Sequence, residues 1–153
     1  MGTEEIHYQR SRFATRLFGD RLYTSGHHWL RREEADLWHV GLSKFAIRML
    51  GEVVEMGFEV ERGARIETGQ TIGWLEAFKA VTDLYAVLSG RFEGSNPELD
   101  REIRLVQTDP YGRGWLYAVR GTPDEGCIDV HGYVAVLDAT IDKMLGQRHD
   151  SNG

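Results

Sequence analysis

The sequence has little cysteine, little proline and no long hydrophobic run. Its 153 residues include one cysteine, Cys127, so no disulfide can form within the chain and a disulfide-stabilised fold is excluded. No stretch approaches the roughly 18 consecutive apolar residues of a membrane-spanning helix, so we expect no membrane partner. The N-terminus is acidic and is not followed by an apolar run. We therefore expect no secretory signal and a cytoplasmic protein.

Positive charge is also scarce. The chain has 24 acidic and 18 basic residues, a formal net charge of −6. A protein that binds duplex nucleic acid needs a dense basic face to displace counterions, so we expect no nucleic-acid partner. A hydrophobic share of 41% and a charged share of 27% are typical of one globular domain. This length leaves no room for a two-domain enzyme with its own cofactor fold.

Composition divides the chain into three segments. Residues 1–21 form an N-terminal arm that is rich in arginine from Tyr8 onward, and we expect it to pack on the body or to dock a partner. Residues 22–146 carry the patterned sequence of the domain. Gly146 is placed to end a helix, so residues 147–153 are predicted to be a flexible tail.

The pattern within the domain predicts a mainly β fold with two helices. Apolar residues alternate over 53–60, which indicates a strand with Val54 on its buried face. Ser43 and Gly51 are suited to begin and end a short helix over 44–50. A C-terminal helix is predicted from one apolar stripe, formed by Val130, Val134, Leu137, Ile141 and Met144.

One predicted hairpin places a lysine at its tip. The predicted strands 71–76 and 81–88 are separated only by residues 77–80, and Ser89-Gly90 ends the second strand. So short a connection folds back as a hairpin with Lys79 at or beside the tip. A tip lysine projects far from the body, so a modifying enzyme can reach it. An amide formed there removes the positive charge.

Other candidate chemistry lacks its partners. Ser25, His27 and His28 suggest a nucleophile with a base, but no Gly-x-Ser-x-Gly turn is present. Cys127 and His131 have the spacing of half a metal site, but no second pair of ligands accompanies them. We therefore expect neither catalytic residues nor a metal site in this chain.

Four blocks of the sequence resemble the H protein of the glycine cleavage system. The most specific reads Glu76-Ala77-Phe78-Lys79-Ala80 followed by Asp83-Leu84-Tyr85-Ala86, and it is similar to the family's lipoyl-lysine hairpin. The resemblance covers roughly residues 22 to 145. The other blocks occur in the family's order and are Tyr23-Thr24 through Trp29, Val40-Gly41-Leu42 with Phe45-Ala46 and Leu50-Gly51, and Asp109-Pro110-Tyr111-Gly112 with Gly114-Trp115-Leu116.

The resemblance implies a fold and a cofactor. The fold is the flattened barrel-sandwich hybrid of lipoyl and biotinyl domains, with a short internal helix and a C-terminal helix. The cofactor is lipoic acid in amide linkage to Lys79, and the chemistry then belongs to the lipoyl group. Glu76 and Asp83 would help a lipoate ligase or lipoyl-assembly enzyme and later partners to recognise the hairpin. The chain is thus expected to be a carrier subunit and not an enzyme.

Departures from the family pattern bear on which enzymes this carrier serves. His28 stands where the family has Glu, Phe78 replaces a smaller β-branched residue, and the valine-rich strand after Gly90 is absent. We favour a lipoate-binding protein of sulfur-oxidising prokaryotes, which serves a heterodisulfide-reductase-like complex, because the Phe78–Tyr85 run resembles that group. The alternative is a glycine cleavage H protein that carries the aminomethyl intermediate. An unlipoylated interaction module is the third interpretation.

Overall fold

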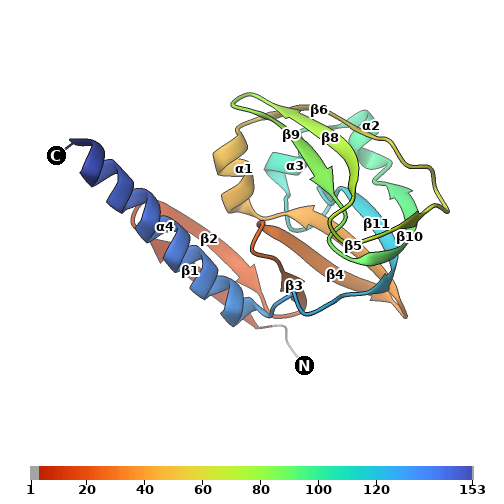
Figure 1. Ribbon diagram of the computed structural model, residues 1–153, viewed down its shortest axis with the longest axis horizontal. Coiled ribbons are helices and arrows are strands. Elements are labelled where there is room, and N and C mark those ends of the chain that lie inside the picture. The colour runs from red at the N-terminus through yellow and green to blue at the C-terminus, as the bar shows by residue number, and fades with distance from the viewer. Residues whose placement is uncertain (1–3, 153) are drawn as a thin grey trace.

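The protein is a layered β structure with a long C-terminal helix (Figure 1). The computed structural model describes residues 4–152, and for residues 148–152 it describes the backbone alone. The strands are β1 (Glu5–Arg10), β2 (Phe13–Phe18), β3 (Arg21–Tyr23), β4 (His28–Glu34), β5 (Leu37–Leu42), β6 (Val53–Phe58), β7 (Arg65–Ile66), β8 (Thr71–Ala77), β9 (Val81–Tyr85), β10 (Ser89–Ser95) and β11 (Tyr117–Thr122). The helices are α1 (Lys44–Leu50), α2 (Glu98–Arg101), α3 (Leu105–Thr108) and α4 (Val130–Asn152).

The main core lies between two antiparallel sheets. One has six strands in the order β3-β4-β5-β11-β10-β7, and the other has three in the order β6-β8-β9. Leu30, Val40 and Val119 of the first sheet join Ile72 and Leu75 of the second in one fully buried cluster. Burying apolar side chains from both sheets is the main source of stability here. The mainly β fold with a C-terminal helix is confirmed.

A second core joins the N-terminal arm to α4. The arm is a β1–β2 hairpin, and it lies along α4 to one side of the sheets (Figure 1). Leu17 of the hairpin and Leu137 of α4 are fully buried in this core, together with Tyr133. Arg21, assigned to the arm from the sequence, is instead the first residue of β3 and is buried. The predicted arm 1–21 is therefore structured over its described residues, and residues 1–3 lie outside them.

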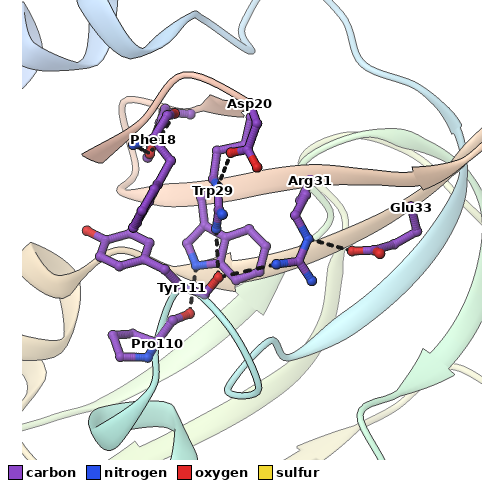
Figure 2. Close-up of polar contacts among 9 residues, drawn as sticks. Phe18, Asp20, Trp29, Arg31, Glu33, Pro110 and Tyr111 are labelled. Carbon is purple, nitrogen blue, oxygen red and sulfur yellow. Dashed lines mark hydrogen bonds and ion pairs between the residues drawn. The ribbon is translucent and has the colours of Figure 1, made fainter. Parts of the chain in front are cut away.

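An arginine of β3 and a tryptophan of β4 join these strands to the Pro110–Tyr111 turn, and the tryptophan's bond to Pro110 is drawn in Figure 2. The indole Nε1–H of Trp29 donates to the carbonyl of Pro110 at 2.9 Å. The Arg21 guanidinium lies 4.9 Å from the Trp29 ring centroid and donates to the Tyr111 carbonyl at 2.7 Å. Asp20 accepts a further bond from Arg21 at 2.9 Å, so this buried charge is paired.

Several predicted boundaries need correction. Val54 is 58% exposed because a register shift between Val53 and Glu55 turns Val53 into the core instead. The chain does not leave the sheet at Gly90, since Ser89–Ser95 form β10 between β11 and β7. The C-terminal helix continues past Gly146 to Asn152, so residues 147–152 are helical. No helix within the described residues is long and apolar enough to cross a membrane.

Candidate functional site

The β8–β9 connection is a tight turn with a lysine at its tip. Ala77 and Ala80 close the turn, because the Ala77 amide donates to the Ala80 carbonyl at 2.8 Å and the Ala80 amide donates back at 3.3 Å. Phe78 and Lys79 are the two residues between them, and both are exposed. The predicted position of Lys79 at the hairpin tip is confirmed.

The turn is fixed to the end of α1 by its backbone. The Phe78 amide donates to the Glu52 carbonyl and the Lys79 amide to the Leu50 carbonyl, both at 2.8 Å. The Lys79 Nζ donates to the Arg48 carbonyl at 3.2 Å. The main chain of Lys79 is thus held in place while its side chain stays at the surface. These acceptors are main-chain carbonyls, so no side-chain signal in the sequence could have indicated them.

Gly51 allows this close approach of the turn to α1. Its φ of 81° and ψ of −169° lie in a region that only glycine adopts readily. A Cβ on Gly51 would lie 3.2 Å from the Cγ of Lys79 and 3.3 Å from the Cβ of Phe78. The sequence predicted Gly51 as the end of the helix, and it also supports the lysine-bearing turn.

Replacing Gly51 by alanine should therefore both destabilise the protein and displace the turn. We expect a loss of roughly 1–3 kcal/mol in the free energy of unfolding, measured by urea titration, because the backbone conformation is strained for any other residue. Modification of Lys79 by a lipoate ligase should slow as well. Gly63→Ala is the matched control, since Gly63 also has a positive φ of 94° but a Cβ added there would meet nothing within 4 Å. Equal lipoylation rates in the two variants would contradict this role of Gly51.

Helix α1 is itself anchored by a buried polar network. The Ser43 side chain caps the helix by accepting from the Ala46 amide at 3.5 Å. The Tyr133 hydroxyl of α4 lies 2.7 Å from Ser43 Oγ and 2.8 Å from His27 Nδ1. Burial raises the pKa of Tyr133, so its hydroxyl stays protonated. The network thus connects α4 to the helix that supports Lys79.

Glu76 and Asp83 lie on the exposed face of the same hairpin. Glu76 is paired with Val81 in the register of β8 and β9, and Asp83 is paired with Trp74. Side chains alternate along strands, so these carboxylates share the outer face, on the side of the hairpin away from the core. Their role in recognition by a partner remains a prediction.

Apolar side chains are unusually exposed around Lys79. Phe78 is 83% exposed and Val81 72% exposed, and Val54, Met49 and Tyr85 are each more than 40% exposed. Four of them lie on the turn or on the segments next to it, whereas Tyr85 lies at the far end of β9, where it is paired with Thr71. Exposed apolar residues gathered around one polar group are typical of a surface that binds other proteins.

The other candidates from the sequence do not form sites. Cys127 Sγ faces the Val87 carbonyl at 3.6 Å, whereas His131 Nε2 pairs with Glu4 at 2.8 Å. Burial raises the pKa of Cys127 to about 11, which leaves an unreactive thiol. His27 bonds to Tyr133, as described above. Within residues 4–152, no group of three or more potential ligands is arranged to hold a metal ion.

His28 gives the fold a pH dependence. Burial, with a smaller contribution from neighbouring His27, lowers the pKa of His28 to about 4, against an ordinary value near 6.5. The unfolded chain takes up a proton below about pH 6.5, whereas the folded chain does so only near pH 4. The contribution of His28 to the free energy of unfolding is therefore fully present above pH 6.5 and is lost as the pH falls to 4.

Replacing His28 by glutamine should flatten this dependence. We expect the wild-type free energy of unfolding to fall more than that of His28→Gln between pH 7 and pH 4.5, by up to roughly 3 kcal/mol. Urea titrations of both proteins at each pH measure the difference, and all other titrating groups are common to the two. Parallel curves would show that His28 takes up its proton equally in the folded and unfolded chains.

Lys79 fits an amide-linked prosthetic group better than the other two lysines of the chain. Lys44 is the first residue of α1 and Lys143 lies within α4, whereas Lys79 is at an exposed turn. Its Nζ donates to a main-chain carbonyl at the surface, so acylation leaves no buried partner unpaired. A flattened β structure that presents a lysine at a hairpin turn defines the class of lipoyl- and biotinyl-carrier domains.

Comparison with known proteins identifies the family within this class. The family model described as "Glycine cleavage H-protein" matches residues 21–129. The glycine cleavage system H protein of Mycobacterium leprae is 40% identical over 127 residues, which are 82% of this chain and 87% of that protein. That of Mycobacterium tuberculosis is 41% identical over 126 residues, with the same coverage. The crystal structure of the H protein from Mycobacterium marinum superposes with a TM-score of 0.67 at 32% identity and covers 76% of this chain and 95% of that one.

The chain therefore belongs to the glycine cleavage H-protein family. Members of this family are lipoyl carriers and not enzymes themselves. The relatives named above are glycine cleavage proteins, so they support the glycine cleavage alternative better than the sulfur-oxidation interpretation that we favoured from the sequence. The matched region begins at Arg21, so β1–β2 and α4 lie outside it.

Proposed function

We propose that this protein carries lipoic acid on Lys79 and serves as the carrier of a glycine cleavage system. The observation that supports this most is the placement of Lys79 at an exposed two-residue turn whose backbone is fixed to α1. The lipoyl group, when bound, supplies a disulfide that accepts electrons or a transferred group. The chain itself positions Lys79, and with it the amide, through the backbone bonds that fix the turn to α1. A single cysteine that is half-buried suits work in the reducing cytoplasm.

The covalent link between the lipoyl group and Lys79 explains how so small a protein can serve several enzymes. A group attached to Lys79 is presented to each partner at a high effective concentration, because it cannot diffuse away from the docked carrier. The exposed apolar residues Phe78 and Val81 flank the attachment point on the turn and β9, where each partner must approach. Glu76 and Asp83 add negative charge to the same face, and we assign them to recognition by lipoate ligase and the glycine cleavage enzymes.

Reconstitution tests the choice of system. The lipoylated protein is added to glycine decarboxylase, aminomethyltransferase and tetrahydrofolate, with dihydrolipoyl dehydrogenase and NAD⁺ to reoxidise the lipoyl group, and release of carbon dioxide from glycine is followed. We expect turnover that depends on the lipoylated chain and stops with the unlipoylated one. A lipoylated chain that supports no turnover, beside a positive control with a mycobacterial H protein, would contradict this assignment.

A sulfur-oxidation system with a heterodisulfide-reductase-like complex is the second candidate. It is supported by His28 and Phe78, which depart from the family pattern. Genes for the reductase-like subunits next to this one would favour it, and genes for glycine decarboxylase would favour the first. If Lys79→Arg has no effect on either system, the chain is instead an unlipoylated interaction module.

A further inference from the structure

Strand β6 leaves one edge of the three-stranded sheet open. The sheet runs β6-β8-β9, so β8 occupies one side of β6, and within residues 4–152 no strand pairs with the other side. Proteins commonly protect such an edge with a bulge, a proline or a charge, because an open edge is a template for adding another strand. The bulge at Val53–Glu55 protects only the first half of β6. The second half, Met56–Phe58, has neither a charge nor a proline.

The backbone of this second half offers hydrogen-bonding groups at the open edge. The Glu59 amide donates to the Ile72 carbonyl at 2.8 Å. Backbone directions alternate along an antiparallel strand, so Gly57 also turns its amide and carbonyl toward β8, whereas Met56 and Phe58 turn theirs away. Met56 and Phe58 thus each present an N–H donor and a C=O acceptor at the open edge.

A groove of about 630 Å³ runs along this edge. Its near wall is β6, where Val54, Met56 and Phe58 contribute apolar surface. Its far wall is α2 with the residues that follow it, where Leu99 is buried and Ile103 is half-buried. An extended residue fills roughly 160 Å³, from a rise of about 3.3 Å, a strand spacing of about 4.8 Å and a sheet spacing of about 10 Å. The groove is therefore matched to an extended segment of about four residues.

The charge beside the open edge indicates which kind of segment fits. Glu55 is directly opposite Glu76 in the register of β6 and β8, and both are exposed. Like charges in this position repel each other, so a lysine or arginine placed beside Glu55 by an added strand is stabilising. A second copy of β6 paired about Gly57 would instead place Glu59 opposite Glu55 and add to the repulsion. The charge therefore favours a basic segment of another protein.

The groove continues into the surface around Lys79. Val54 lines the groove and is 58% exposed. Its neighbour Val53 is paired with Ala77, the residue at which the lysine-bearing turn begins. An enzyme that docks on the turn to receive the lipoyl arm therefore also covers the start of the groove.

We propose that the open edge of β6 binds an extended segment of the enzyme that receives the lipoyl arm. The proposal rests on the function proposed above, since the lipoyl arm is what brings that enzyme to the turn. The segment pairs with Met56 and Phe58 through its main chain, packs alternate apolar side chains against Leu99 and Ile103, and places a lysine or arginine beside Glu55. The main-chain bonds supply affinity, and the groove and Glu55 supply selectivity.

Hydrogen exchange tests the strand pairing directly. Single amides are resolved by fragmentation in the mass spectrometer. In the free carrier we expect the amides of Met56 and Phe58 to exchange quickly, whereas the Gly57 amide, which is bonded to β8, is protected. Saturating the lipoylated carrier with aminomethyltransferase or with glycine decarboxylase should slow exchange at Met56 and Phe58 by at least about tenfold. Gly57 is the internal reference, because its amide is bonded in both states.

Two pairs of variants separate main-chain pairing from charge. Met56→Pro removes an outward amide without removing a bond to β8, and Met56→Leu is its control because it keeps the amide. Calorimetry should show that only the proline variant binds the enzyme roughly tenfold more weakly. Glu55→Lys should weaken binding by roughly two- to fivefold. Glu125→Lys is its control, since Glu125 is exposed, lies outside the groove and gives the same change in net charge.

The outcomes separate this proposal from the function on which it rests. A lipoylated carrier that binds neither enzyme overturns the proposed function, and the role of the edge with it. Binding that leaves exchange at Met56 and Phe58 unchanged overturns the strand pairing and leaves the carrier function intact. This result needs no variant, so it decides the question even if Met56→Pro does not fold. Protection of both amides in the free carrier, with a dimer in sedimentation, would overturn the proposal in favour of a second copy at the edge.

Discussion

The Lys79→Arg variant should lose lipoylation and all carrier activity while it keeps its fold. An arginine side chain retains the positive charge and can still reach the Arg48 carbonyl, but its guanidinium is not acylated by a lipoate ligase. Because Lys79 is exposed, we expect the free energy of unfolding to change by less than about 0.5 kcal/mol. Activity in the reconstituted system should fall to the level measured without any carrier.

Two further lysines provide the controls for this result. Lys44→Arg and Lys143→Arg remove the other two lysines of the chain and should leave both lipoylation and turnover unchanged. Turnover by Lys79→Arg above background would show that the carrier function does not depend on an amide at this position.

The Trp29→Ala variant should have the largest effect on stability. Trp29 is fully buried, and its indole donates to the carbonyl of Pro110 (Figure 2). The Arg21 guanidinium lies over its ring. Truncation removes a large apolar side chain and leaves a cavity, which costs roughly 3–5 kcal/mol. The carbonyl of Pro110 also loses its donor. A domain of this size is stable by only about 5–15 kcal/mol, so the variant should unfold at a much lower urea concentration.

Trp29 also restricts which residue can occupy the neighbouring position on β5. A Cβ on Gly41 would overlap the indole ring, so the two residues specify each other across β4 and β5. Trp29→Phe retains an aromatic ring but loses the bond to Pro110, and its loss of stability should be intermediate. A loss below about 1 kcal/mol for Trp29→Ala, measured by urea titration, would contradict the view that Trp29 is central to the stability of the domain.

Local signals in the sequence predicted the lysine-bearing turn and its support. The bounds of α1 follow from the cap at Ser43 and the glycine at 51, and both signals lie within one turn of the helix. The position of Lys79 follows from the shortness of the connection between two strands. The position of Lys79 at the turn was therefore predictable without any long-range information.

Features that depend on distant residues could not be predicted in this way. Strand β10 contains Gly90 and Gly94, which disrupt the expected pattern, and it is stabilised by pairing with β11, about thirty residues later along the chain. The groove along the open edge of β6 brings Met56 together with Leu99 and Ile103, which lie much later in the chain. A spacing pattern in the sequence cannot predict a contact between residues that are far apart in the chain and that only the fold brings together.

The central claim is that Lys79 alone carries a lipoyl group, and intact-mass measurement with peptide mapping tests it most directly. The folded chain is incubated with a lipoate ligase, lipoate and ATP. We predict a single lipoyl adduct, located on the peptide that contains Lys79 and absent from Lys79→Arg. A folded chain that remains unmodified, or an adduct located on Lys44 or Lys143, would contradict the account.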